Sequence, residues 1–123
     1  MNNCWILIGA ISCSLSVIIG AFGAHGLKDI LTEYGQDIYN KANFYHFIHS
    51  LALILNGILA KLFTEINFSL SGYLFLIGII LFSFSLYVLS IYTDAKILGA
   101  ITPFGGVCFI VGWIYIALKI YNT

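Results

Sequence analysis

The chain has 123 residues, of which 61% are hydrophobic, 16% aromatic and only 8% charged, and its formal net charge is zero. Ordinary soluble domains carry about 25% charged residues. A soluble fold of this size could not cover its surface with so few polar groups. The composition excludes a soluble globular domain and a disordered chain, and the lack of a basic patch excludes nucleic acid as a partner. An integral membrane protein remains, with the lipid bilayer as its first partner.

Four long runs without a charged residue locate the membrane spans, since a helical span needs about 20 apolar residues. We expect spans near residues 4–24, 45–63, 70–92 and 98–120, within a single domain that covers residues 1–123. Short connections between the later spans favour antiparallel neighbours. The sequence therefore predicts an all-α, four-helix up-down bundle in the membrane, with both termini on one side.

The connection between the first two spans has a pattern of its own. Apolar residues recur at helical spacing at Leu27, Ile30, Leu31, Tyr34 and Ile38. This predicts a short amphipathic helix that lies on the membrane surface, interrupted or capped at Gly35. A polar surface loop is the alternative.

Small residues recur every fourth position in the first span, at Ser12, Ser16, Gly20 and Ala24. Helices in lipid associate through close packing, and small residues let their backbones approach. We expect this stripe to make the main contact within the bundle. Contact with a second copy of the chain is the competing use.

The second span carries most of the polar groups. His49, Ala52, Asn56 and Ala60 share one face, and polar side chains in a span must point into the bundle. Serine hydroxyls on the first and third spans are the expected partners of Asn56, and these are Ser12, Ser16, Ser83, Ser85 and Ser90.

The three histidines are the candidate site residues that could take part in the largest number of chemical roles. His46 and His49 are three apart and could bind one metal ion with His25 as a third ligand, or could ligate a haem. No His-Glu-x-x-His motif or carboxylate-rich site accompanies them, so we expect structural polar residues, no metal and no cofactor. His25, Tyr45 and His49 are expected to gather at the membrane interface. With His46 and Asn56 they form the predicted polar cluster.

Pro103 lies in the fourth span and is followed closely by Gly105 and Gly106. Proline removes a backbone donor and clashes with the preceding turn. The fourth helix is therefore expected to begin near Pro103 or to be kinked there. A packing kink is favoured over an ion or substrate site.

Four segments together resemble one family. They are Gly20-Ala-Phe-Gly-Ala-His25-Gly-Leu-Lys28, Tyr45-His-Phe-Ile-His49-Ser-Leu-Ala-Leu53, Leu81-Phe-Ser-Phe-Ser-Leu-Tyr87 and Ile101-Thr-Pro103-Phe-Gly-Gly106. The chain resembles domain-of-unknown-function family 423, also called uncharacterised protein family 0382, and transmembrane protein 256 of eukaryotes is similar. The resemblance implies a small multi-span protein of the bacterial inner membrane, with His25, His49 and Pro103 as characteristic residues.

These observations favour a non-enzymatic membrane protein with a structural, assembly or accessory role. No Gly-x-Ser-x-Gly motif is present, and the acidic residues all lie in the connections between spans. A small transporter or channel component that uses the polar face of the second span is the alternative. A metal- or haem-binding protein is a more distant one. Other membrane proteins or a second copy of the chain are the candidate protein partners.

Overall fold

A computed structural model describes residues 2–123 of the chain. Its helices are α1 (Asn2–His25), α2 (Glu33–Leu62), α3 (Ser69–Gly78), the π-helical segment η1 (Ile79–Phe84), α4 (Ser85–Ile91) and α5 (Lys96–Tyr121). The segments α3, η1 and α4 follow one another without a break and form a single span. The described residues thus hold four helices long and apolar enough to cross a membrane. The predicted all-helical, four-span architecture is confirmed.

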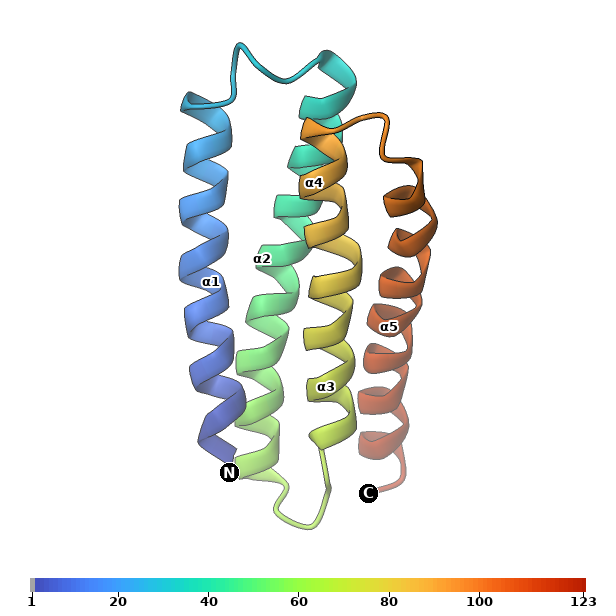
Figure 1. Cartoon of the computed structure of the whole chain (residues 1–123). Helices are drawn as coiled ribbons and strands as arrows, with labels where there is room; N and C mark the ends of the chain where they lie inside the picture. The colour runs from blue at the N-terminus through green and yellow to red at the C-terminus, as the bar shows by residue number, and fades with distance from the viewer. Residues whose placement is uncertain (1) are drawn as a thin grey trace.

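The four spans run antiparallel in chain order, and both termini lie at the same end of the bundle (Figure 1). The first span, α1, packs along α2, while α5 packs along the third span. The second span, α2, contacts both α1 and the third span and so lies at the centre of the arrangement. The outer helices α1 and α5 bury the smallest shares of their residues, so their apolar side chains face outward.

The segment between the first two spans differs from its prediction. Residues 33–44 do not form a separate interfacial helix but are the first three turns of α2. Apolar side chains of this segment are part of the bundle core. Tyr39 and Ala42 pack in a buried cluster with Leu27 and Tyr87. The connection itself is short and covers residues 26–32.

Gly35 neither interrupts nor ends a helix. It lies in the first turn of α2, where its backbone N–H donates to the hydroxyl of Thr32 at 3.0 Å. This side chain satisfies one of the unpaired N–H groups at the start of the helix. A Cβ atom on Gly35 would lie 2.5 Å from the backbone oxygen of Ser90. Glycine therefore lets α2 approach α4 closely.

The fourth span does not begin at Pro103. Helix α5 begins at Lys96, and Pro103 lies inside it. Of the two glycines that follow, Gly105 is buried against η1, where a Cβ would lie 2.4 Å from the backbone nitrogen of Phe82. Gly106 has room, since its nearest neighbour would be 3.8 Å away. Gly105 therefore permits a close contact between α5 and η1.

Candidate functional site

The small stripe on α1 meets polar side chains of α2. Ser16 is buried, and its backbone oxygen accepts from the Asn43 amide at 2.8 Å. A Cβ atom on Gly20 would lie 2.7 Å from Oδ1 of Asn43, so glycine leaves room for this side chain. Ser12 faces α2 as well, whereas Ala24 is exposed at the end of α1. The contact between α1 and α2 is therefore a hydrogen-bonded one as well as a packed one.

His46 is fully buried at the centre of a network that joins α1, α2 and α4. The Ser50 hydroxyl donates to the backbone oxygen of His46 at 2.7 Å, so the Ser50 oxygen accepts from the Ser12 hydroxyl at 2.5 Å. With the only proton of Ser12 in use, Nε2–H of His46 donates to the Ser12 oxygen at 3.1 Å.

The other ring nitrogen of His46 is then fixed as an acceptor. A neutral imidazole carries one N–H, and a charged one is costly in a membrane span. Nδ1 of His46 therefore accepts from the Tyr87 hydroxyl at 2.9 Å. The oxygen of Tyr87 accepts in turn from the Asn43 amide at 3.1 Å. Both ring nitrogens of His46 and the hydroxyls of Ser12, Ser50 and Tyr87 thus each have a partner.

His49 joins α2 to α5 in a second, separate arrangement. The indole N–H of Trp113 donates to Nε2 of His49 at 3.0 Å, which leaves Nδ1–H to donate to the backbone oxygen of Tyr45 at 2.9 Å. The His49 ring stacks on Phe109, with ring centroids 3.5 Å apart and an interplanar angle of 10°. His46 and His49 thus hold opposite tautomers, and both nitrogens of each ring are occupied.

Asn56 is fully buried between α2 and the start of α3. Its amide donates to the backbone oxygen of Phe68 at 3.0 Å, and its Oδ1 accepts from the Ser71 hydroxyl at 2.5 Å. The expected partners of Asn56 were wrong, because Ser71 takes that place. The side chain ties the turn between the second and third spans to α2.

The structure does not bring His25 into either histidine arrangement. His25 is exposed at the last residue of α1, whereas His49 lies 16 residues into α2, about 24 Å along that helix. The expected interfacial cluster of His25, Tyr45 and His49 is therefore wrong. In residues 2–123, no group of three His, Cys, Asp or Glu side chains is placed to hold a metal ion.

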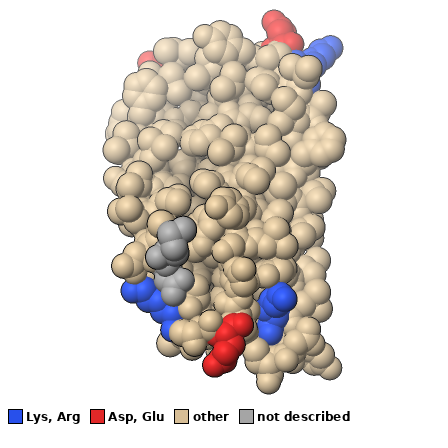
Figure 2. All heavy atoms as spheres, turned by 60° about the horizontal axis from the view of Figure 1, so that its bottom comes forward, with Lys and Arg blue, Asp and Glu red and all other residues tan. Residues whose placement is uncertain are grey.

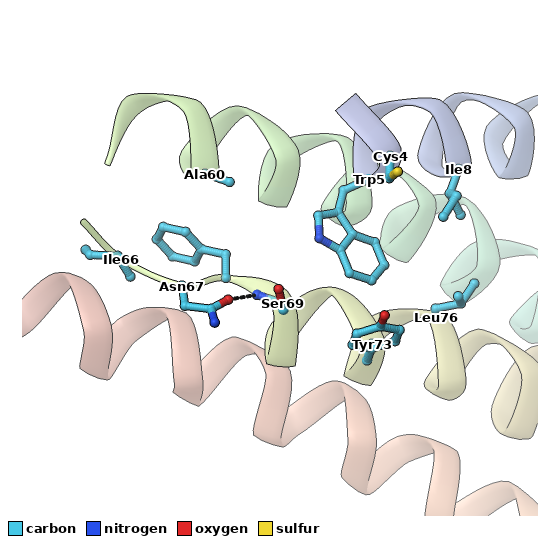
Figure 3. A pocket seen from close by; sticks show the side chains of 10 residues that line it. Cys4, Trp5, Ile8, Ala60, Ile66, Asn67, Ser69, Tyr73 and Leu76 are labelled. Atoms are coloured by element: carbon cyan, nitrogen blue, oxygen red, sulfur yellow. Dashed lines mark hydrogen bonds between the residues drawn. The ribbon is translucent and has the colours of Figure 1, made fainter. Parts of the chain in front are cut away.

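A cavity of about 260 Å³ lies at the end of the bundle that carries the termini, between α1, α2 and the start of α3 (Figure 3). Trp5 and Tyr73 form part of its wall and pack edge to face, with ring centroids 5.0 Å apart. Asn67 and Ser69 supply polar groups, and the Asn67 side chain accepts from the backbone N–H of Ser69 at 2.9 Å. This cavity combines hydrogen-bonding groups with an apolar wall.

Sequence reasoning missed several members of these arrangements. Asn43, His46 and Ser50 share one face of α2, at spacings of three and four residues, but Asn43 falls outside a span that begins at residue 45. A longer second helix would have placed these three together. The hydrogen bonds of Tyr87 and Trp113 could not be predicted from the sequence, because they join helices far apart in the chain.

The fold and its buried hydrogen bonds define a class: a small polytopic membrane protein whose helices are joined by polar side chains. The model of the family described as "Protein of unknown function (DUF423)" matches residues 19–106, and the chain belongs to that family.

Two similar proteins come from bacteria. The chain is 42% identical over 118 residues to UPF0382 membrane protein SAB0533 of Staphylococcus aureus (strain bovine RF122 / ET3-1), covering 96% of this chain and 95% of the relative. It is 44% identical over 115 residues to UPF0382 membrane protein YwdK of Bacillus subtilis (strain 168), covering 93% of each. No solved structure matches the chain.

Proposed function

We propose that the protein is a non-enzymatic accessory protein of the bacterial inner (plasma) membrane, which acts by supporting or assembling other membrane proteins. The observation that carries this proposal is how the polar side chains within the bundle are used. His46, His49 and Asn56 each bond to groups on neighbouring helices or turns, so their hydrogen-bonding capacity holds the fold together. Such a bundle contacts partners through its outer faces, of which α1 and α5 are the most exposed.

Conduction of protons is the second candidate, because the chain of hydrogen bonds through His46 is continuous. This series of hydrogen bonds follows α2 from Asn43 to Ser50, which is about 10 Å at 1.5 Å per residue. The hydrocarbon core of a bilayer is about 30 Å thick. The chain therefore covers roughly a third of the distance, and this length favours the structural role.

Two measurements test the proposal. A photo-crosslinking residue at Ile18 or Phe104, both more than 60% exposed, is expected to capture a membrane protein in native membranes, whereas one at the buried Leu53 is not. Proton flux into proteoliposomes is expected to equal that of empty vesicles. Flux that is present in the natural chain and lost in His46→Gln would contradict the accessory role and favour conduction.

A further inference from the structure

Two cavities that share Ile8 and Leu76 lie in line between α1 and the third span, and together they are called the groove. Its lower half is the cavity at the end of the bundle, and its upper half is a second cavity of about 260 Å³ against α3 and η1. Ile8 and Leu76 line both cavities, and Figure 3 shows them facing one another across the gap. The groove exists because α1 packs mainly on α2 and leaves its other side open.

The lining of this groove holds both polar and apolar groups at one end and is almost wholly apolar at the other. The lower half carries Trp5, Asn67, Ser69 and Tyr73. The upper half is apolar except for Ser12, whose hydroxyl is used by His46 and Ser50, and its remaining walls are Ile11, Leu15, Ile79, Ile80 and Phe84. From Ser69 to Phe84 the third span rises about 22 Å, which exceeds half the thickness of a hydrocarbon core of about 30 Å. A molecule in the groove would therefore meet polar groups at the membrane boundary and, apart from Ser12, only apolar ones at depth.

The polar end of the groove lies at the level of the lipid headgroups. Tryptophan and tyrosine favour that level of a bilayer, and Trp5 and Tyr73 meet there. Lys61 and Lys119 belong to the same end, against the single acid Glu65, and Figure 2 shows the charged side chains confined to the ends of the bundle. In the part of the chain that the structure describes, the Trp5 indole N–H has no partner, and Figure 3 shows its nitrogen directed into the cavity.

We propose that this groove binds one glycerophospholipid. One acyl chain lies against the apolar walls from Leu76 to Phe84, and the ester region accepts from the indole N–H of Trp5. The phosphate faces the lysine-bearing end. A helix of a second copy is the competing occupant, and the oligomeric state of the variants below separates it from a lipid.

Native mass spectrometry of the full chain in detergent with added dioleoyl-phosphatidylglycerol tests the site. We expect a one-to-one adduct. Ile80→Trp places an indole where the acyl chain of the lipid would lie. It should weaken lipid binding by about tenfold, because the acyl chain loses its contacts there. Trp5→Phe keeps a ring and removes the N–H, and should weaken the adduct by a smaller factor. Ile110→Trp is the matched control on the outer face of α5, where Ile110 is 60% exposed, and should bind as the natural chain does.

Helix content and elution volume check that each variant folds, and Ile11→Trp on the opposite wall replaces Ile80→Trp if the latter does not. Lack of a one-to-one adduct, or equal adducts in the Ile80→Trp and Ile110→Trp variants, would overturn the lipid site. A dimer that Ile80→Trp abolishes would assign the groove to a second copy and would overturn it too. The lipid site does not depend on the accessory role, which crosslinking to proteins tests separately.

Discussion

The hydroxyl of Tyr87 on α4 lies 2.9 Å from Nδ1 of His46 on α2, although 41 residues separate the two in the chain. Asn43 donates to the same hydroxyl oxygen and also binds the backbone of Ser16 on α1. One phenol group thereby joins the third span to the contact between the first two. In lipid, where hydrophobic expulsion does not drive helices together, packing and such bonds hold the helices in register.

Replacement of this phenol should weaken the fold. Tyr87→Phe removes the donor to His46 and the acceptor for Asn43 while keeping the ring. Each of these two bonds contributes about 0.6–2 kcal/mol, so the free energy of unfolding should fall by about 1–4 kcal/mol. Titration of the purified protein from mild detergent into sodium dodecyl sulfate measures the loss by circular dichroism. Tyr92→Phe, at a residue 67% exposed, should change little. Equal effects of the two substitutions would show that the network contributes nothing measurable.

Adjacent glycines in α5 should respond oppositely to alanine. A Cβ on Gly105 would meet the backbone of η1 at 2.4 Å, and that backbone cannot rotate away as a side chain could. Gly105→Ala should therefore destabilise the protein by about 1–3 kcal/mol, the usual cost of overpacking. Gly106→Ala, with its nearest neighbour 3.8 Å away, should be neutral or slightly stabilising. The same unfolding titration checks both variants. A small destabilisation by Gly105→Ala would mean that α5 lies further from η1.

Composition and hydropathy could predict the spans, because lipid demands long apolar helices whatever their neighbours are. The extension of α2 by three turns was missed. Helical spacing around Tyr34 and Ile38 signalled a helix, but periodicity alone cannot say whether its apolar face meets lipid headgroups or another helix. The burial of Tyr39 against Tyr87 decides this, and that contact depends on the third span.

The same distinction between contacts within a helix and contacts between helices applies to the candidate site. His49 and Asn56 could be placed on one face of the second span from the sequence, and His46 was named because it lies three residues before His49. Their partners could not be, since Trp113, Tyr87 and Ser71 come from other helices whose rotation the sequence does not give.

Two buried serines should differ in their response to alanine. Ser50 bonds to Ser12 and to its own helix, whereas Ser83 Oγ is the only buried side-chain polar atom of the described residues without a partner. An unpaired buried hydroxyl costs about 1–3 kcal/mol. Ser83→Ala should therefore leave stability unchanged or raise it, while Ser50→Ala should lower it. Detergent unfolding of both variants measures the difference, and a strongly destabilised Ser83→Ala would indicate that this hydroxyl is bonded.

The four-span topology predicts on which side of the membrane a fused reporter domain lies. Both termini lie at one end of the bundle, and residues 26–32 lie at the other (Figure 1). A reporter fused after Thr123 should therefore report the same side of the membrane as one fused at the N-terminus. A reporter inserted between Gly26 and Leu31 should report the opposite side. Termini on opposite sides would contradict the four-span arrangement.

The last prediction concerns the protons on the two buried histidines. The direction of each hydrogen bond assigns Nε2–H to His46 and Nδ1–H to His49. Solid-state NMR of ¹⁵N-histidine in lipid bilayers separates the two tautomers, because protonated and unprotonated ring nitrogens differ widely in chemical shift. His46→Gln and His49→Gln assign the signals by deletion. Trp113→Phe should then release the constraint on His49 alone and leave the His46 signals unchanged. The same tautomer at both residues would mean that the Ser12–Ser50 chain runs in the other direction or that the Trp113 N–H does not bind His49.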